Sequence, residues 1–392
     1  DWNFEDVTES MGLRDPALAD RVEQAHAVVW VDLDDDGDLD LYVTNLGPNA
    51  LWRNRGNGTF ENVAAEAGVD NSSWGTSTAF LDYDGDGDLD LFVANYLRWN
   101  ENSENPCKSK LGAPDYCHPN NYDAPDSDLL YENLGDGTFR NVSTASGITE
   151  DFGNGLGVVW GDMTQDGLVD IYVANDSMPN LLYRNDGDWG LTEVGALAGV
   201  AYSEDGRSQA GMGIASGDYD NDGDLDLLVT NFSDDANTLY QNQGDGLFFD
   251  ATAAAGLDGE VRPYLGWSTA FFDGDNDGWL DLFVANGHIY PQVDLHTSGI
   301  GYAQHNLYYR NVGGFFQSSA SSVGLGLVKV SRGAAFGDYD NDGDIDILVV
   351  NLNDTPTLLE NRGGDRNNWL GLELVGVESN RDALGAMVRL AV

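Results

Sequence analysis

The chain has few cysteines, few basic residues and no long apolar run. Its 392 residues include 2 Cys, 5 His, and 18 Lys and Arg against 67 Asp and Glu, for a formal net charge of −49. Because no run of about 20 apolar residues occurs, the sequence predicts no membrane span. The acidic excess opposes binding to nucleic acid or anionic membranes. The scarcity of histidine and the lack of a nucleophile motif argue against an enzyme.

What is abundant is one aspartate-rich pattern, which occurs six times. The copies, numbered loops 1 to 6 in chain order, begin at Asp32, Asp82, Asp162, Asp218, Asp273 and Asp338. Carboxylates at positions 1, 3, 5 and 9 with Gly at position 6 suit Ca²⁺, a hard cation that takes six to eight oxygen ligands. Position 7 varies in side chain, which fits a ligand supplied by the backbone carbonyl.

The predicted ligands are therefore the residues at positions 1, 3, 5, 7 and 9 of each loop, for about six Ca²⁺ ions. They are Asp32, Asp34, Asp36, Asp38 and Asp40; Asp82, Asp84, Asp86, Asp88 and Asp90; Asp162, Thr164, Asp166, Leu168 and Asp170; Asp218, Asp220, Asp222, Asp224 and Asp226; Asp273, Asp275, Asp277, Trp279 and Asp281; and Asp338, Asp340, Asp342, Asp344 and Asp346. Loop 3 is expected to bind most weakly, because Thr164 removes one charge.

Two other readings of these loops compete with calcium sites between strands. An EF-hand needs flanking helices and a Glu at position 12, whereas Asp stands at position 9 here and strand-like residues such as 39–43 follow. Ordinary Asp-Gly hairpin turns would explain one copy. Six copies with the same spacing favour cation sites that join two antiparallel strands.

Each loop opens a longer repeat that returns every 50 to 80 residues or so. An Asn always follows 13 residues after the first Asp, at Asn45, Asn95, Asn175, Asn231, Asn286 and Asn351. A third strand of the type 51–54, a Gly-rich turn and a fourth strand of the type 60–63 come next. Four short strands with tight turns are typical of a propeller blade.

The sequence thus predicts an all-β fold, a β-propeller of four-stranded blades with a calcium loop between strands 1 and 2. Small residues alternate along each first strand, which suits the crowded axis of a propeller. Six calcium loops favour six blades. The alternative is a seventh blade built from 369–374, 386–390 and the N-terminal strand. Phe4 and Val7 match the fourth-strand pattern, so the N-terminus is expected to complete the last blade.

Several segments resemble a known group. The repeats look like the FG-GAP/VCBS repeats of integrin α-chain propellers, and VANDSMPNLLYRN at 173–185, ANGHIYP at 285–291 and NRDALGA at 380–386 resemble the ASPIC/UnbV family. The resemblance implies a propeller over 1–364 and the incomplete start of an ASPIC/UnbV-like β segment over 365–392. It also implies a secreted or surface-attached calcium-binding protein linked to adhesion or matrix, and it supplies no catalytic residue.

Cysteine usage and calcium need bear on compartment. Cys107 and Cys117 lie ten residues apart in a Pro- and Asn-rich insert, which favours a local disulfide over a metal site or free thiols. Loops of this kind also need more calcium than the cytosol offers. Both points favour an extracellular location, secreted or on the cell surface, over the periplasm.

Two repeats carry long inserts between strands 2 and 3, at about 96–128 and 287–305, on the face opposite the calcium loops. They hold the partner-binding candidates, which are Trp99, Tyr116, His118, Tyr122, His288, Tyr290, His296, Tyr302 and His305. Long loops on a rigid scaffold commonly carry function, and aromatic residues suit protein or glycan surfaces. Packing on the propeller rim is the alternative role, and a histidine metal site at His288, His296 and His305 matches no tight zinc spacing.

Two classes of function remain open at this point. The first, which the sequence favours, is a non-catalytic scaffold for adhesion, interaction or assembly, including self-assembly through the unfinished C-terminal segment. The second is a secreted propeller enzyme, a lyase or hydrolase acting on polysaccharide with His or Tyr from the long inserts. Fold does not decide between them.

Overall fold

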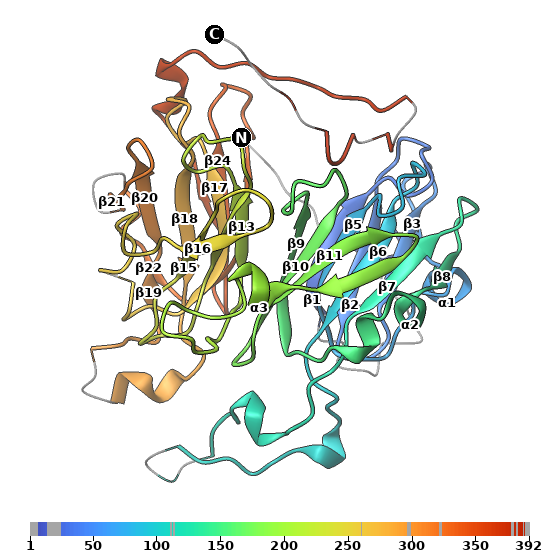
Figure 1. Ribbon diagram of the computed structural model, residues 1–392, viewed down its shortest axis with the longest axis horizontal. Coiled ribbons are helices and arrows are strands. Elements are labelled where there is room, and N and C mark those ends of the chain that lie inside the picture. The colour runs from blue at the N-terminus through green and yellow to red at the C-terminus, as the bar shows by residue number, and fades with distance from the viewer. Residues whose placement is uncertain are drawn as a thin grey trace.

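The computed structural model consists almost entirely of short antiparallel strands. It describes residues 7–13, 25–109, 112, 114–259, 261–295, 299–320, 324–377, 380–381, 383–386 and 388. Within them the strands form six successive sheets, the blades, and one small two-stranded sheet (Figure 1). The six-bladed all-β propeller predicted from the repeats is therefore confirmed.

Five blades have four strands, and each blade follows chain order outward. Blade 1 is β1 (Ala25–Val31), β2 (Asp40–Asn45), β3 (Ala50–Asn54) and β4 (Phe60–Asn62); blade 2 is β5 (Gly75–Leu81), β6 (Asp90–Asn95), β7 (Leu129–Asn133) and β8 (Phe139–Asn141); blade 3 is β9 (Gly155–Gly161), β10 (Asp170–Asn175), β11 (Leu181–Gly187) and β12 (Gly190–Glu193). Blade 4 is β13 (Ile214–Gly217), β14 (Asp226–Val229), β15 (Thr238–Asn242) and β16 (Phe248–Asp250); blade 5 is β17 (Gly266–Phe272), β18 (Asp281–Asn286), β20 (Leu307–Asn311) and β21 (Phe316–Ser318).

Blade 6 has three strands among the described residues, β23 (Ser331–Gly337), β24 (Asp346–Asn351) and β25 (Thr357–Leu359). β19 (Gln304–His305) pairs with β22 (Val328–Lys329) beside it. The described residues after Arg366 contain no strand, so the segments proposed for a seventh blade form no sheet there. Of the N-terminal segment expected to complete the last blade, residues 1–6, with Phe4, lie outside the described residues, and Val7 is described but belongs to no strand.

The few helices are single turns in connections. They are α1 (Ala64–Ala67), α2 (Ser143–Ser146), α3 (Gly195–Ala198) and the 3₁₀ turns η2 (Glu101–Ser103), η3 (Pro119–Asn121), η4 (Ile148–Glu150), η5 (Pro291–Leu295) and η6 (Gly364–Arg366). Among the described residues, no helix combines the length and the apolarity that crossing a bilayer requires.

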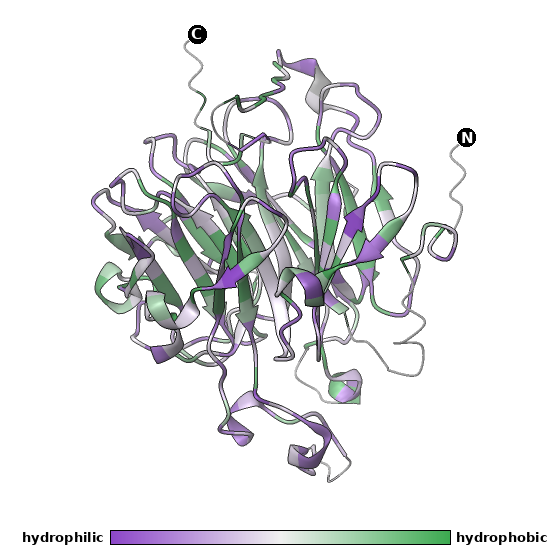
Figure 2. Ribbon diagram, turned by 90° about the vertical axis from the view of Figure 1, so that its right-hand side faces the viewer, coloured by the Kyte–Doolittle hydropathy of each residue, from purple (hydrophilic) through white to green (hydrophobic). Residues whose placement is uncertain are grey.

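Apolar side chains fill the spaces between blades. Every residue of β6, β10 and β18 is buried, because each of these second strands has a neighbouring blade on both faces. Five hydrophobic cores join successive blades from 1 to 6, and the pair Tyr42 and Leu91 illustrates the first of them. Figure 2 shows the same partition, with hydrophobic residues along the strands and hydrophilic residues in the loops.

The face of blade 1 that looks away from blade 2 is covered differently. Met11 and Leu13 pack against its buried residues, among them Trp52 and Phe60, and the Phe60 amide donates to the Met11 carbonyl at 2.7 Å. Gly12 (φ +76°) approaches the Phe60 carbonyl, as Gly68 (φ +79°) approaches that of Phe139 in the next blade. Residues 7–13 thus contact the fourth strand of blade 1 in the way that the segment after β4 contacts the fourth strand of blade 2.

Blades 1 and 6, which are the first and last blades in chain order, also carry exposed apolar residues. Trp30 on β1 is 52% exposed, and Val350 on β24 is 51% exposed, whereas the counterpart of Val350 in blade 5, Ala285, is fully buried. Residues of β1, β5, β9 and β13, together with Leu384, line a central cavity of about 470 Å³. The innermost position predicted for the first strands is therefore correct for these four.

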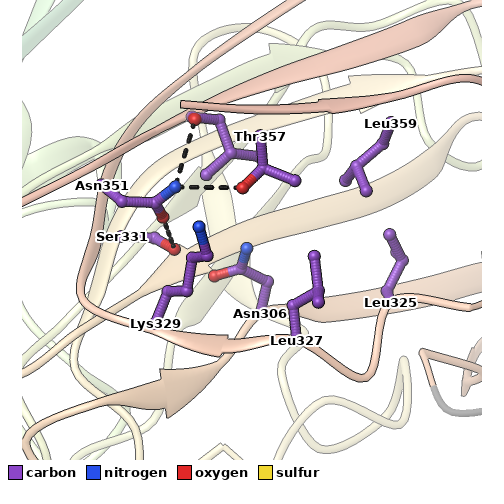
Figure 3. Close-up of a pocket in the computed structure, with 9 residues that line it drawn as sticks. Asn306, Leu325, Leu327, Lys329, Ser331, Asn351, Thr357 and Leu359 are labelled. Atoms are coloured by element: carbon purple, nitrogen blue, oxygen red, sulfur yellow. Dashed lines mark hydrogen bonds between the residues drawn. The ribbon is translucent and has the colours of Figure 1, made fainter. Parts of the chain in front are cut away.

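The repeated asparagine that ends each second strand anchors the connection to the third strand. In blade 6, the Asn351 amide group donates to the Thr357 hydroxyl at 3.1 Å and accepts from the Ser331 hydroxyl at 3.0 Å (Figure 3). It also donates to the Thr355 carbonyl at 2.9 Å. In blades 2 and 5, the same amide holds the far end of a long insert, at Ser127 and His305. One residue type thus fixes connections of very different length.

Candidate metal centres and recognition face

The six aspartate loops share one backbone geometry. Position 4 is left-handed in all of them, with φ between +53° and +76°, and the Gly at position 6 has φ between +89° and +101°. Side chains rarely adopt φ near +90°, so Gly is required at position 6. This turn joins the first and second strands of every blade, as the sequence predicted.

Hydrogen bonds within each loop orient its carboxylates. In loop 4, the Asp218 carboxylate accepts from the amides of Asp222 at 3.0 Å and Gly223 at 2.9 Å, and the Asp222 carboxylate accepts from the Asp224 amide at 3.0 Å. Loops 1, 3, 5 and 6 contain the same three bonds. The backbone therefore pre-positions the remaining oxygens toward the loop centre.

The Asp at position 9 is buried at the start of the second strand. Asp226 is fully buried, and it accepts from the amides of Asn242 at 2.8 Å and Tyr219 at 3.1 Å. The side chain of Asn242, which ends the third strand, donates to the Leu225 carbonyl at 3.1 Å and to the Met163 carbonyl of loop 3 at 3.0 Å. Each aspartate loop from 2 to 5 is tied in this way to the next blade.

Five of the loops gather three carboxylates whose oxygens lie within 4.8 Å of one another. Among the described residues these are the groups Asp32, Asp34 and Asp36; Asp82, Asp84 and Asp86; Asp218, Asp220 and Asp226; Asp273, Asp275 and Asp277; and Asp338, Asp340 and Asp346. Loop 3, where Thr164 replaces a carboxylate, is not among them. The sequence thus singled out the loop that differs.

A cation fits these loops because carboxylate oxygens there lack protein partners. Oδ2 of Asp40, Oδ1 of Asp82, Oδ1 of Asp220 and Oδ1 of Asp275 are buried without a hydrogen bond. A buried, unpaired carboxylate oxygen is costly. An oxygen-only donor set of this charge suits Ca²⁺, and Ca²⁺ would supply the missing partner.

The same burial shifts the titration of the position-9 groups. Burial, with the nearby charges of Asp84 and Asp86, raises the pKa of Asp90 to about 8 against hydrogen bonds from two backbone amides. Burial likewise raises the pKa of Asp226 to about 8 and that of Asp281 to about 6. Without a counter-ion, these loops resist full ionisation.

The long inserts emerge at the opposite ends of the strands, as predicted. The insert between β6 and β7 projects from the lower edge of the molecule in Figure 1. A disulfide between Cys107 and Cys117, with 5.3 Å between the Cα atoms, closes this insert and confirms the predicted pairing. The insert between β18 and β20 contains η5.

The two inserts contact each other, although blades 2 and 5 lie three apart in the series. The Gln292 amide donates to the Asp115 carboxylate, and the rings of Tyr116 and Tyr290 lie 6.3 Å apart. Phe232, from the connection between β14 and β15, packs edge-on against Tyr290 at 6.2 Å. The inserts therefore form one continuous surface from three blades.

The predicted partner-binding residues divide by exposure. Tyr116 is 67% exposed, whereas His288 is 3% exposed. Both His288 ring nitrogens are engaged, one with the Ser233 hydroxyl at 3.1 Å and one as acceptor from the Tyr290 amide at 3.0 Å. Burial also lowers the pKa of His288 to about 4. This histidine is buried beneath the insert, where its two hydrogen bonds connect Ser233 with Tyr290.

The remaining candidates lie along the inserts. Trp99 and Tyr122, both half-buried, donate to the Glu104 carboxylate; His118 is exposed beside Ser177; Tyr302 is half-buried and His305 is exposed on β19; His296 lies outside the described residues. Among the described residues, no group of three potential metal ligands includes a histidine.

Sequence reasoning missed three features of these sites. It recorded the Asn at the end of each third strand without its bond to the preceding loop. It also missed Phe232 and the contact of Gln292 with Asp115. The fixed spacing of the asparagines was a usable signal, whereas contacts between distant inserts leave none in a single sequence.

A family model described as FG-GAP-like repeat matches this chain at residues 32–93, 117–173, 162–229 and 218–284. The matches together span more than half of the 392 residues. Each matched stretch begins at or includes aspartate loops, so the repeat identified from the loops and strands is the unit that the model describes.

Curated relatives share the name cartilage acidic protein 1. The human protein is 27% identical over 286 residues, which cover 68% of this chain and 38% of the relative. The Xenopus tropicalis protein is 24% identical over 377 residues, which cover 90% of this chain and 53% of the relative. The chain thus spans about half or less of their length.

Among solved structures, an Agrocybe aegerita lectin that recognises non-reducing terminal N-acetylglucosamine is similar at 15% identity and a TM-score of 0.44. The similarity covers 87% of this chain and 82% of that one. A likeness of that extent supports no functional comparison.

Proposed function

Because this chain belongs to the family of FG-GAP-like repeat proteins, we propose that it is a calcium-binding, extracellular propeller that acts as a non-catalytic interaction scaffold. One observation carries the calcium part of this proposal. Buried carboxylate oxygens without partners, such as Oδ1 of Asp82 and Oδ1 of Asp220, recur in loops of one shared geometry. In this view Ca²⁺ supplies charge neutralisation and structural cross-linking.

The ligands would be the carboxylates at positions 1, 3, 5 and 9, which the loop hydrogen bonds already orient. Because Asn242 and its counterparts link loops 2 to 5 to the next blade, an ion in one of these loops would stabilise the interface between blades as well as one turn. The net charge of −49 gives the folded chain a further need for cations.

The extracellular assignment draws on two supports. A disulfide in an insert persists most readily in an oxidising compartment, and calcium sites of this type fill at extracellular calcium concentrations. The name cartilage acidic protein 1 of the curated relatives agrees with such a setting.

We assign recognition of a protein or glycan surface to the two inserts. They are the long connections of the propeller, they contact each other through Tyr116 and Tyr290, and they stand apart from the loops that calcium would occupy. Exposed aromatic rings on a rigid base suit either kind of partner. A second copy of the chain is the alternative occupant of this face.

Thermal melting with and without a chelator tests the calcium proposal. Removal of Ca²⁺ is expected to lower the melting temperature by many degrees, because repulsion among the clustered carboxylates returns. Mg²⁺ should restore stability poorly, since it demands near-octahedral geometry and gives up water reluctantly. An unchanged melting curve in excess chelator would refute the proposal.

A further inference from the structure

One variable residue stands in or just after the third strand of each blade, immediately before a repeated asparagine. In blades 1, 4 and 5 it contacts the aspartate loop of the same blade, whereas in blades 2, 3 and 6 it pairs with Arg140, Asp186 and Arg362. Its identity in blades 1 to 6 is Arg53, Glu132, Arg184, Gln241, Arg310 and Glu360. The charge at this position therefore runs from positive to negative, while the loops themselves keep nearly the same carboxylates.

In loop 5 the contact is an ion pair with two predicted ligands. The Arg310 guanidinium pairs with Asp275 and also with Asp277, where Nη2 lies 3.1 Å from Oδ2. Both carboxylates belong to a group whose oxygens lie within 4.8 Å of one another. Oδ1 of Asp275 is nevertheless buried without a hydrogen bond, so the arginine leaves one oxygen of this carboxylate without a protein partner.

In blade 1 the positive charge lies farther from the loop carboxylate, and in blade 4 the side chain is neutral. Arg53 Nε lies 3.7 Å from Oδ2 of Asp34 in loop 1, and the neutral Gln241 amide donates to the Asp220 carboxylate in loop 4. In blade 2 the residue is Glu132, which is paired with Arg140. The same position thus places a positive charge against loop 5 and a neutral amide against loop 4.

Resting on the calcium sites proposed above, we infer that this third-strand residue grades the calcium affinity of the loops. Arg310 lowers the calcium affinity of loop 5 below that of loop 4, where the neutral Gln241 stands at the same position. A dication and a guanidinium that share carboxylates repel each other, even at the dielectric constant of water, by the equivalent of about tenfold in affinity. The propeller would then load calcium over more than one concentration range.

Loop 5 offers its own optical probe, because Trp279 stands at position 7. We would titrate Tb³⁺ into the full calcium-free chain and follow Tb³⁺ emission sensitised through this indole, with Ca²⁺ as competitor. Trp279→Leu, which copies Leu168 of loop 3, should remove the Tb³⁺ emission that comes from loop 5. The emission lost in this variant is thereby assigned to loop 5.

The test compares three charges at one position. Arg310→Gln, which copies blade 4, should lower the half-saturating Tb³⁺ concentration by more than the tenfold expected for Ca²⁺, roughly thirtyfold, because Tb³⁺ carries a third charge, and Arg310→Glu, which copies blade 2, should lower it further. Arg207→Gln, which removes an exposed arginine paired with Asp205, should change nothing. Equal half-saturation for Arg, Gln and Glu would overturn the inference while leaving calcium binding intact. Absence of Trp279-sensitised emission in every variant would instead refute cation binding at loop 5 itself.

Discussion

Removal of calcium is expected to make the protein less stable at pH 8 than at pH 5. The position-9 carboxyls decide this, since Asp90 is 1% exposed and Asp226 is fully buried. Burial raises the pKa of each to about 8 in the folded chain, from an ordinary value of 3.8. Between those two values the folded chain holds protons that the unfolded chain has lost, so the free energy of unfolding falls as pH rises.

The size of the effect follows from the shift. Each pKa unit corresponds to about 1.4 kcal/mol, so a rise of roughly four units amounts to about 6 kcal/mol per group once the pH exceeds 8. The stability that protonation provides is complete below pH 3.8 and is lost progressively up to about pH 8. Bound Ca²⁺ would keep the carboxylates ionised and remove this dependence.

Differential scanning calorimetry on dialysed, calcium-free protein at pH 5 and pH 8 measures the effect, with saturating calcium as the comparison. Asp90→Asn removes one titrating group and should flatten the calcium-free profile. If calcium-free protein melts at the same or a higher temperature at pH 8 than at pH 5, the reasoning about buried carboxyls is wrong.

Further predictions concern single parts of the propeller. At limiting calcium, loop 3 should lose its ion first in crystals or cryo-EM maps, and an empty four-carboxylate loop beside an occupied loop 3 would contradict the ranking. Deletion of residues 1–8 should expose a strand edge and promote aggregation, measured by light scattering; a monomeric, equally stable product would contradict it. Replacement of 98–127 by a short turn should keep calcium-dependent stability and abolish partner binding in a pull-down or glycan array; binding that survives this and a matching deletion of 288–304 would put recognition elsewhere. Asn242→Ala should destabilise by about 3 kcal/mol in chemical unfolding, because two buried carbonyls lose their donor, and Asn54→Ala, whose amide is exposed, should cost less.

The repeat made most of the fold readable from one sequence. Spacing of Asp, Gly and Asn within each copy defined the loop, the flanking strands and the side on which the inserts emerge. The position of Asn351 relative to Asp338 is one example, and the structure adds that this amide anchors the following connection. Six loops favoured six blades over seven, and the structure has six, with one loop between the first two strands of each.

What the sequence left open depends on contacts between distant residues. Nothing in the local pattern indicates that Gln292 reaches Asp115 or that His288 lies beneath its insert. The contact of Arg310 with Asp275 also needed the register of β18 on β20. Packing and electrostatics across the fold decide these features, and a single sequence does not display them.

The central claim is that the aspartate loops hold calcium, and counting bound ions tests it most directly. Equilibrium dialysis against millimolar calcium, followed by metal analysis of the full chain, should give about six Ca²⁺ per molecule. The double variant Asp218→Asn and Asp220→Asn should bind one ion fewer. A chain that retains no calcium, or the same number in both forms, would contradict the account.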